Sequence, residues 1–139
     1  LAHVTEYTGL KGRWQVLQEQ PKMIADTGHN ESGMKEVIRQ LESQAYGQLW
    51  MVIGMVQDKD IGKVLDLFPK EATYIFCQAG IPRAMDAATL AAKAGERGLQ
   101  GRVIPRVAEA IEFARKNAKP NDLIFIGGST FVVAEIENL

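Results

Sequence analysis

The sequence predicts an α/β protein whose open, doubly wound, mostly parallel sheet carries helices on both faces. Short apolar segments alternate with segments of helical periodicity along nearly the whole chain. Hydrophobic residues make up 46% of the chain and charged residues 24%, which are ordinary values for a globular domain. The chain of 139 residues contains no repeat, low-complexity tract or internal linker. We therefore expect residues 1–139 to form a single domain.

Two short apolar segments, 14–17 and 23–25, begin the predicted fold. The polar residues 18–22 between them, which include Pro21, indicate a hairpin or another tight connection between two strands. An amphipathic helix follows, and either Asn30 or Ser32 is available as its N-cap. Its apolar face consists of Met34, Val37, Ile38, Leu41 and Ala45.

The run 49–53 is apolar without alternation, which is typical of a strand that is covered on both faces of a parallel sheet. The same rhythm of strand and helix then continues to the end of the chain. It predicts a helix over 61–68, a strand over 74–77, a helix over 87–94 with Asp86 as N-cap, a short strand at 103–104, a helix over 107–118, a strand over 123–126 and a helix over 131–136. Such alternation implies right-handed crossovers between parallel strands.

Charge and cysteine content exclude several classes of protein. The net charge of -1, from 16 basic and 17 acidic side chains, provides no positive field for nucleic acid or an anionic membrane, so neither partner is expected. The single cysteine, Cys77, lies in an apolar run and is expected in the core, which favours a reducing, cytoplasmic location. The start at Leu1, followed by Gly9 and Gly12, suggests a fragment of a longer protein.

Ligands of open α/β sheets collect at the carboxyl ends of the strands, so the strand-to-helix junctions are the candidate sites. The first junction combines a carboxylate, an imidazole and an amide in Asp26, His29 and Asn30. Asp26 could accept hydrogen bonds from ribose hydroxyls, and His29 could meet a phosphate or carboxylate at the helix start. Alternatively, Asp26 and Asn30 only satisfy backbone amides of the loop.

Two further junctions carry weaker signals. Asp58, Lys59 and Asp60 follow the apolar strand over 49–53, where an aspartate N-cap and a solvated lysine would explain them. The segment 127–130, Gly-Gly-Ser-Thr, lies between a strand and a helix and would let the backbone approach a ligand closely. A serine or threonine cap is the commoner explanation of that segment.

Several catalytic motifs are absent from the sequence. The two histidines, His3 and His29, form no pattern with zinc-ligand spacing. Neither a G-x-S-x-G elbow nor a phosphate-cradling G-x-x-x-x-G-K-[ST] loop occurs. The chain therefore does not encode a complete hydrolytic or nucleotide-hydrolysing site.

The order of the motifs nevertheless resembles a known family. Gly12–Val16 comes first, Asp26–Asn30 follows, then Asp58–Asp60, and Gly128–Glu135 comes last. This order is similar to that of the carboxy-terminal, Rossmann-like domain of folylpolyglutamate synthase and dihydrofolate synthase, which are relatives of the Mur ligases. The similarity covers nearly the whole chain, and the spaced Gly-Arg and Asp-x-x-His-Asn motifs are its most specific part.

The resemblance implies an ATP-dependent amide ligase. In that family ATP phosphorylates the carboxylate of a folate or dihydropteroate, and the amine of L-glutamate attacks the acyl phosphate. The phosphate loop and the Mg²⁺ ligands belong to a larger amino-terminal domain, whose motifs are absent here. We therefore expect this chain to complete the ATP and glutamate site when the amino-terminal domain closes on it, and to be inactive alone.

The resemblance also assigns roles to individual residues. Arg13 matches the arginine that reaches the ATP phosphates, a role that suits a guanidinium fork. Asp26 matches the aspartate that contacts the ribose of ATP. His29 and Asn30 match a pair beside the reacting groups, with His29 the candidate catalytic residue and Asn30 a candidate ATP contact. Ser129 matches a serine at the glutamate site.

The resemblance further predicts that Arg13 and Asp26 lie on one edge of the sheet, with side chains free of strong internal partners. A rival hypothesis is a non-catalytic α/β module, such as a receiver-like domain. Its phosphorylated carboxylate and its lysine are missing at the strand ends, which read Phe76-Cys77-Gln78 and Ile126-Gly127-Gly128. A dinucleotide-binding domain is a third hypothesis, but no glycine-rich fingerprint follows a predicted strand.

Overall fold

Strands and helices alternate through the residues that the computed structural model describes, 14–28, 30–57 and 61–136. The strands are β1 (Gln15–Glu19), β2 (Lys22–Asp26), β3 (Leu49–Ile53), β4 (Thr73–Gln78), β5 (Gly101–Arg106) and β6 (Leu123–Gly127). The helices are α1 (Glu31–Glu42), α2 (Ile61–Leu65), α3 (Ala87–Gly95), α4 (Val107–Asn117) and α5 (Thr130–Ile136).

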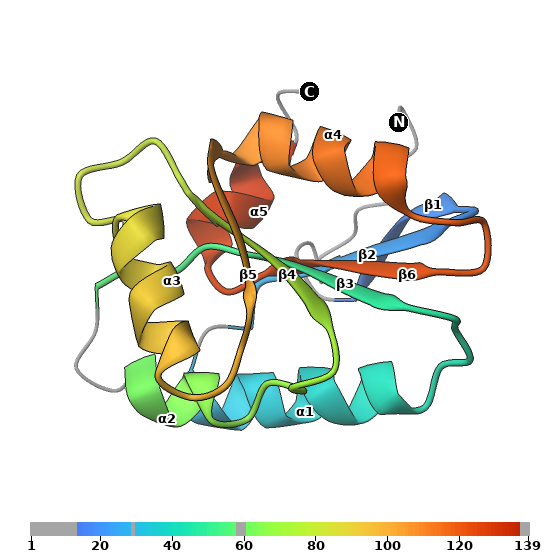
Figure 1. Cartoon of the computed structure of the whole chain (residues 1–139), viewed down its shortest axis with the longest axis horizontal. Helices are drawn as coiled ribbons and strands as arrows, with labels where there is room; N and C mark the ends of the chain where they lie inside the picture. The colour runs from blue at the N-terminus through green and yellow to red at the C-terminus, as the bar shows by residue number, and fades with distance from the viewer. Residues whose placement is uncertain (1–13, 29, 58–60, 137–139) are drawn as a thin grey trace.

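The strands form one sheet in the order β1-β2-β6-β3-β4-β5 (Figure 1). β1 pairs antiparallel with β2, and all other pairs are parallel. The last strand in the sequence, β6, therefore lies in the middle of the sheet between β2 and β3. This arrangement confirms the predicted open, mostly parallel sheet.

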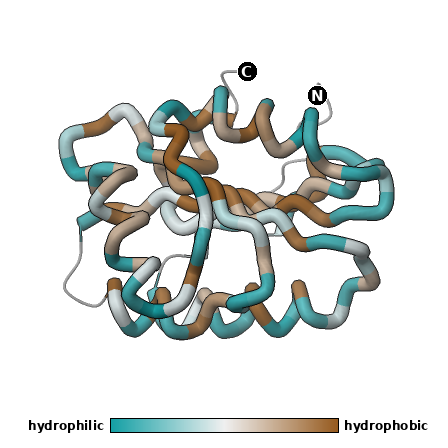
Figure 2. Tube along the Cα trace, in the orientation of Figure 1, coloured by the Kyte–Doolittle hydropathy of each residue, from teal (hydrophilic) through white to brown (hydrophobic). Residues whose placement is uncertain are grey.

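Helices cover both faces of the sheet, as the alternating pattern predicts (Figure 1). α1, α2 and α3 pack on one face, where Leu41, Leu65 and Leu90 contact strand residues such as Met51 and Phe125. Figure 2 shows the apolar residues of the strands gathered between the helical layers. The buried strands are sandwiched, which explains why 49–53 reads as a continuous apolar run.

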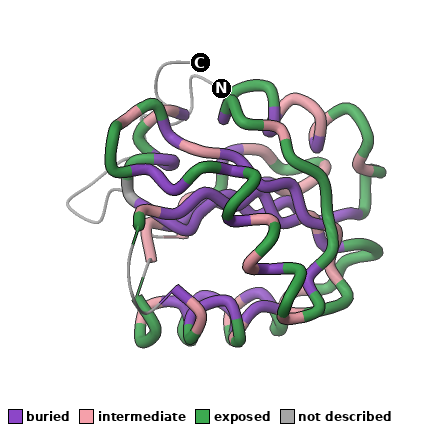
Figure 3. Tube along the Cα trace, turned by 60° about the vertical axis from the view of Figure 1, so that its left-hand side comes forward, coloured by how far each residue is buried: buried purple, intermediate pink, exposed green. Residues whose placement is uncertain are grey.

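α4 and α5 cover the opposite face. Ala110, Ile111 and Val132 pack there against Ile75 and Ile126. In Figure 3 the strands in the interior are mostly buried, while the outer sides of the helices are exposed. Two apolar layers, one on each face, thus hold the sheet between the helices.

Most element positions agree with the predictions, and three differ. α1 ends at Glu42 with Ser43 as its C-cap, so Ala45, which was predicted on its apolar face, lies beyond the helix. Asp86 caps α3 by accepting a hydrogen bond from the Thr89 N–H at 3.1 Å, as predicted. α2 ends at Leu65, three residues before the predicted end, because the Leu67 and Phe68 N–H groups bond to carbonyls three residues back and tighten the last turn. β5 extends well beyond the predicted 103–104, since an exposed edge strand carries no continuous apolar run.

None of the helices in the described ranges has the length and apolar character needed to cross a membrane.

Candidate functional site

Three loops meet at the carboxyl edge of neighbouring strands. They follow β2, β6 and β3, which lie side by side in the sheet. Asp26 at the end of β2 pairs with Gly127 at the end of β6, and Gly127 pairs with Ile53 at the end of β3. The fold thereby brings Asp26, Asn30 and Ser129 to one edge of the sheet although about 100 residues separate the first from the last.

The Asp26 carboxylate is held by the backbone on both sides. Its Oδ1 accepts a hydrogen bond from the Gly28 N–H at 2.7 Å, and its Oδ2 accepts one from the Trp14 N–H at 2.8 Å. The side chain is nearly buried, with the residue 8% exposed. The prediction that Asp26 is free of strong internal partners is therefore wrong, because the turn into β1 brings a backbone donor to it. Each oxygen accepts only one of these bonds, so the carboxylate keeps further lone pairs for a ligand.

Trp14 supplies a contact that the sequence did not reveal. Its φ of 41° makes it the one non-glycine residue with positive φ in the described parts of the chain. This left-handed backbone turns the Trp14 N–H toward the end of β2. Trp14 lines a cavity of about 370 Å³ together with Asp26 and Gly28 from the loop after β2 and with Glu36 and other residues from α1. An aromatic residue thus borders the predicted ribose contact.

Asn30 and Ser129 each begin a helix. The Asn30 Oδ1 accepts a hydrogen bond from the Gly33 N–H at 2.7 Å and caps α1. The Ser129 Oγ accepts one from the Val132 N–H at 3.1 Å, and Ser129 is only 2% exposed. These contacts match the structural alternative considered for both residues, and their predicted ligand roles stay predictions.

Three of the predicted positions lie outside the described residues. They are Arg13, His29 and the segment 58–60. The roles assigned to Arg13 and His29 by resemblance remain predictions, as does the expectation that Arg13 shares an edge with Asp26.

A larger cavity of about 480 Å³ opens beside Asn30, between the first turn of α1, the loop after β3 and α2. Its lining residues include the exposed Lys35 and Lys63, the exposed Glu31, and the apolar Met55 and Val56. Gly128 lines one side of the cavity. Only glycine fits there, because its φ is 100° and an added Cβ would lie 2.5 Å from the Gly54 carbonyl oxygen. The cavity suits a ligand with an anionic group and an apolar body.

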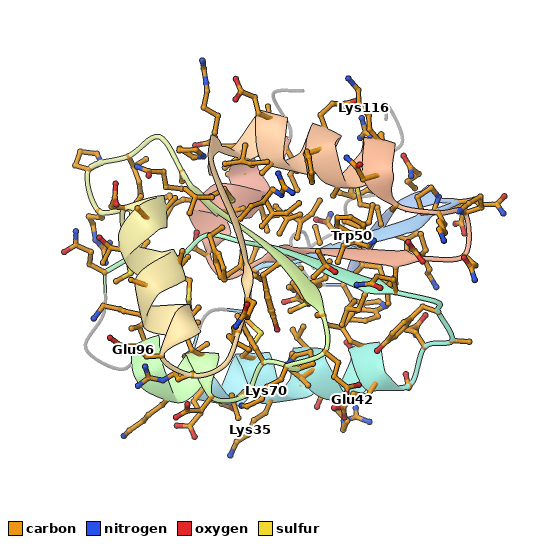
Figure 4. All side chains as sticks on the ribbon, in the orientation of Figure 1. Lys35, Glu42, Trp50, Lys70, Glu96 and Lys116 are labelled. Atoms are coloured by element: carbon orange, nitrogen blue, oxygen red, sulfur yellow. The ribbon has the colours of Figure 1, made fainter. Side chains whose placement is uncertain are left out.

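Asn30 and Gly128 belong to junctions that the sequence marked as candidates, whereas Lys35 and Lys63 were missed because nothing in their spacing marks them. Lys35 reads as a solvated charge on an amphipathic helix, and its ammonium lies 3.9 Å from the exposed Glu31 carboxylate. Figure 4 shows the Lys35 side chain extending from α1 away from the sheet. Only the packing of α1 beside α2 brings Lys35 and Lys63 to the same cavity.

A divalent metal ion has no ready site in the described parts of the chain. Within them, no group of three or more His, Cys, Asp or Glu side chains is placed to hold a metal ion. Each oxygen of the Asp26 carboxylate accepts a hydrogen bond from a backbone amide, and no second acidic group is placed beside it to complete a metal site in the described residues. We therefore derive no chemical step through a metal ion bound by these residues.

The sequence as a whole matches a known family model. The model for the Mur ligase, glutamate ligase domain, matches residues 12–130. A probable bifunctional folylpolyglutamate synthase/dihydropteroate synthase of Haloferax volcanii is 34% identical over 127 residues, which cover 89% of this chain and 15% of the relative. The dihydrofolate synthase/folylpolyglutamate synthase of Escherichia coli is 30% identical over 129 residues, covering 91% of this chain and 30% of the relative.

Solved structures agree with these matches. Escherichia coli FolC in complex with DHPP and ADP has a TM-score of 0.83 at 28% identity, covering 91% of this chain and 30% of that one. A bifunctional folylpolyglutamate synthase/dihydrofolate synthase with Mn, AMPPNP and L-glutamate bound also has a TM-score of 0.83, at 29% identity, covering 93% of this chain and 31% of that one. The chain thus spans less than a third of the length of each of these similar proteins.

Proposed function

The chain belongs to the Mur ligase, glutamate ligase domain, family, and from this membership we propose that residues 1–139 are the carboxy-terminal domain of an ATP-dependent amide ligase. In the proposed reaction the carboxylate of a folate or dihydropteroate takes the γ-phosphoryl group of ATP and releases ADP. The amine of L-glutamate then attacks the acyl phosphate, an amide forms and phosphate leaves. The names of the Haloferax volcanii and Escherichia coli relatives support this substrate class.

The observation that carries the proposal is the meeting of Asp26, Asn30 and Ser129 on adjacent loops of one sheet edge. The cavity of about 480 Å³ beside them is lined by two lysines and one glutamate together with apolar residues such as Met55 and Val64. Positive charge and apolar surface together suit substrates that carry carboxylates and phosphates on an aromatic body. Similar chains with bound ADP, DHPP or L-glutamate support the same assignment.

Each predicted residue receives a role in binding or orientation. Asp26, preorganised by two backbone amides, accepts hydrogen bonds from the ribose of ATP through its remaining lone pairs. Arg13 binds the phosphates, and Asn30 contacts ATP at the start of α1. His29 lies beside the reacting groups as the candidate catalytic residue. Ser129 contributes to the glutamate site.

The remaining parts come from a partner domain in the same longer protein. An amino-terminal domain supplies the phosphate loop and the Mg²⁺ ligands, because this sequence contains no such loop. Mg²⁺ would neutralise charge on the transferring phosphoryl group. Closure of that domain over the carboxyl edge of the sheet completes the site. The buried, unpaired Cys77 supports a reducing compartment, and we place the enzyme in the cytoplasm.

The proposal is tested by turnover of the longer protein. It is incubated with ATP, Mg²⁺, L-glutamate and either dihydropteroate or a folate, and ADP release is followed together with the mass of the product. We expect glutamate-dependent ADP release and a product heavier by one glutamate residue, whereas the 139-residue chain alone gives none. Glutamate-independent ADP release, or no release with either acceptor, would overturn the proposal.

Arg13 separates the nucleotide role from a structural one. In the longer protein, Arg13→Ala is expected to weaken ATP use roughly ten- to hundredfold through loss of a charge-assisted contact. Arg13→Lys recovers only part of this loss, because an ammonium keeps the charge but lacks the planar fork. Steady-state kinetics in ATP and thermal melting are measured on both variants. An unchanged ATP dependence with a lower melting temperature would contradict the role.

A further inference from the structure

The loop over 79–86, between β4 and α3, is bonded to the loop after β3. The contacts are the Gln57 N–H to the Arg83 carbonyl at 3.0 Å, the Met85 N–H to the Met55 carbonyl at 2.8 Å, and a bridge between Val56 and Ala84. Met55 and Val56 are also lining residues of the cavity of about 480 Å³. The part of the cavity wall formed by Met55 and Val56 is therefore hydrogen-bonded to the loop over 79–86.

The other flank of this loop is bonded to α5. The Gly80 N–H donates a hydrogen bond to the Glu135 Oε2 at 2.5 Å, across 55 positions of sequence. A charged acceptor makes this bond stronger than one between neutral groups. The Glu135 carboxylate thus joins the last helix to the loop over 79–86.

The Glu135 carboxylate also acts on the neighbouring end of β4. Burial raises the pKa of the Cys77 thiol to about 12, and the Glu135 carboxylate adds to this effect. Cys77 is the penultimate residue of β4, three positions before Gly80. Glu135 carries no ion pair with a cation in the described residues, so its strongest recorded contact is the Gly80 N–H.

We propose that Glu135 is a positioning residue: it anchors the loop over 79–86 and, through that loop, sets the place of Met55 and Val56 in the cavity wall. Removing the carboxylate frees Gly80 and loosens the bonds between the two loops. Its effect on catalysis rests on the proposed ligase function, whereas its effect on the loops does not. Glu135 lies outside the catalytic contacts and acts only through the backbone of its neighbours.

Hydrogen exchange of the 139-residue chain tests the proposal without any turnover. We compare the wild type with Glu135→Ala, which removes the acceptor, and Glu135→Gln, which keeps a carbonyl oxygen. Glu42→Ala is the matched control, since Glu42 lies at the far end of α1 with no recorded side-chain contact in the described residues (Figure 4). In Glu135→Ala the amides of Met85 and Gln57 should exchange roughly tenfold faster, while those of α1 keep their rates.

Each outcome decides the proposal. Glu135→Gln should retain most of the protection, and Glu42→Ala all of it. Faster exchange at Gly80 with unchanged exchange at Gln57 would show that the loop does not transmit the effect and would overturn the proposal. A uniform rise over all elements would reveal a general loss of stability and would overturn it too. In the longer protein, Glu135→Ala should raise the KM for a substrate more than it lowers kcat. Glu135→Gln should return the KM to near the wild-type value.

If the longer protein showed no ligase turnover while the exchange pattern appeared as expected, the proposed effect of Glu135 on catalysis would be refuted. The anchoring of the loop over 79–86 by Glu135 would still be supported. Turnover that is present but insensitive to Glu135→Ala, beside an altered exchange pattern, would instead mean that the wall formed by Met55 and Val56 does not contact substrate. Hydrogen exchange thereby tests the role of Glu135 in holding the loop, and turnover tests its role in the proposed reaction.

Discussion

Asp26 combines a structural and a proposed binding role in one carboxylate. Backbone amides of Trp14 and Gly28 hold its two oxygens, so the group is fixed before any ligand arrives. A fixed carboxylate loses little conformational freedom on binding a ribose. The sequence predicted a carboxylate at this strand end, but the Trp14 contact depends on a left-handed backbone that no turn residue in the sequence indicates.

Replacement of Asp26 should therefore cost stability even in the isolated chain. Asp26→Ala leaves two backbone amides without their charged acceptor, and we expect a loss of about 2–4 kcal/mol in the free energy of unfolding. Asp86→Ala, which removes a single exposed helix cap, is the control and should cost about 1 kcal/mol. Urea unfolding followed by circular dichroism measures both. Equal losses would mean that the Asp26 bonds contribute little.

Cys77 should make the fold sensitive to alkaline pH. Its pKa is 9.0 in its ordinary state and about 12 in the fold, with burial as the main cause. Between these values the unfolded thiol releases its proton while the folded one retains it, so stability present below pH 9 is lost as the pH rises toward 12.

The variant Cys77→Ala isolates this effect. Between pH 8 and pH 10 the wild type should lose about 1 kcal/mol more unfolding free energy than Cys77→Ala. The pKa of the buried Tyr74 hydroxyl is also raised by desolvation, but both proteins share that contribution. Denaturant unfolding at the two pH values provides the comparison. Parallel losses in the two proteins would contradict the assignment to Cys77.

Among the elements, those with strong periodicity or continuous burial were predictable. β3 occupies the predicted 49–53, and α1 begins after Asn30, one of the two residues that the sequence offered as its cap. The length of β5 was underestimated because most of its residues face solvent and the strand pairs with β4 alone. The contacts of the loop over 79–86 with the loop after β3 were also missed, since they join segments with no shared pattern. Local signals thus located the elements, and tertiary pairing decided their edges.

Asn30 permits a test that separates capping from ligand contact at the level of one helix. Asn30→Ala removes the acceptor for the Gly33 N–H and should lower the stability of the chain by about 1 kcal/mol. Asn30→Ser keeps a capping oxygen and should restore most of that loss. If Asn30 also contacts ATP, Asn30→Ser in the longer protein remains impaired in turnover. Recovery of both properties by serine would indicate a cap alone.

For the whole molecule, the sequence predicted the fold class and the family resemblance, and both are confirmed. It could not predict the strand order, because the position of β6 between β2 and β3 depends on packing across the entire chain. That order determines which loops become neighbours. The junctions after β2, β3 and β6 were each recognised as candidates, but only the sheet shows that they share one edge.

The central position of β6 predicts that both faces of the sheet unfold together. Phe125→Ala removes a fully buried ring from this strand and should cost about 3–5 kcal/mol. Val103→Ala, at a 40% exposed position of the edge strand β5, should change the free energy of unfolding by about 0.5 kcal/mol or less. Tryptophan fluorescence and far-ultraviolet circular dichroism should give the same midpoint for each protein. Separate midpoints would reveal two independently folding layers.

The late place of β6 in the sequence also bears on how the protein is made. As the chain leaves the ribosome, β2 and β3 emerge long before the strand that joins them, so each exposes an unpaired edge until Leu123–Gly127 have been released. A nascent chain that stops before Leu123 would lack the middle of its sheet and would be a ready target for chaperones and proteases. Release of β6 would complete the sheet and bring the loops of the proposed site together, so that a chain without β6 never presents a finished binding edge.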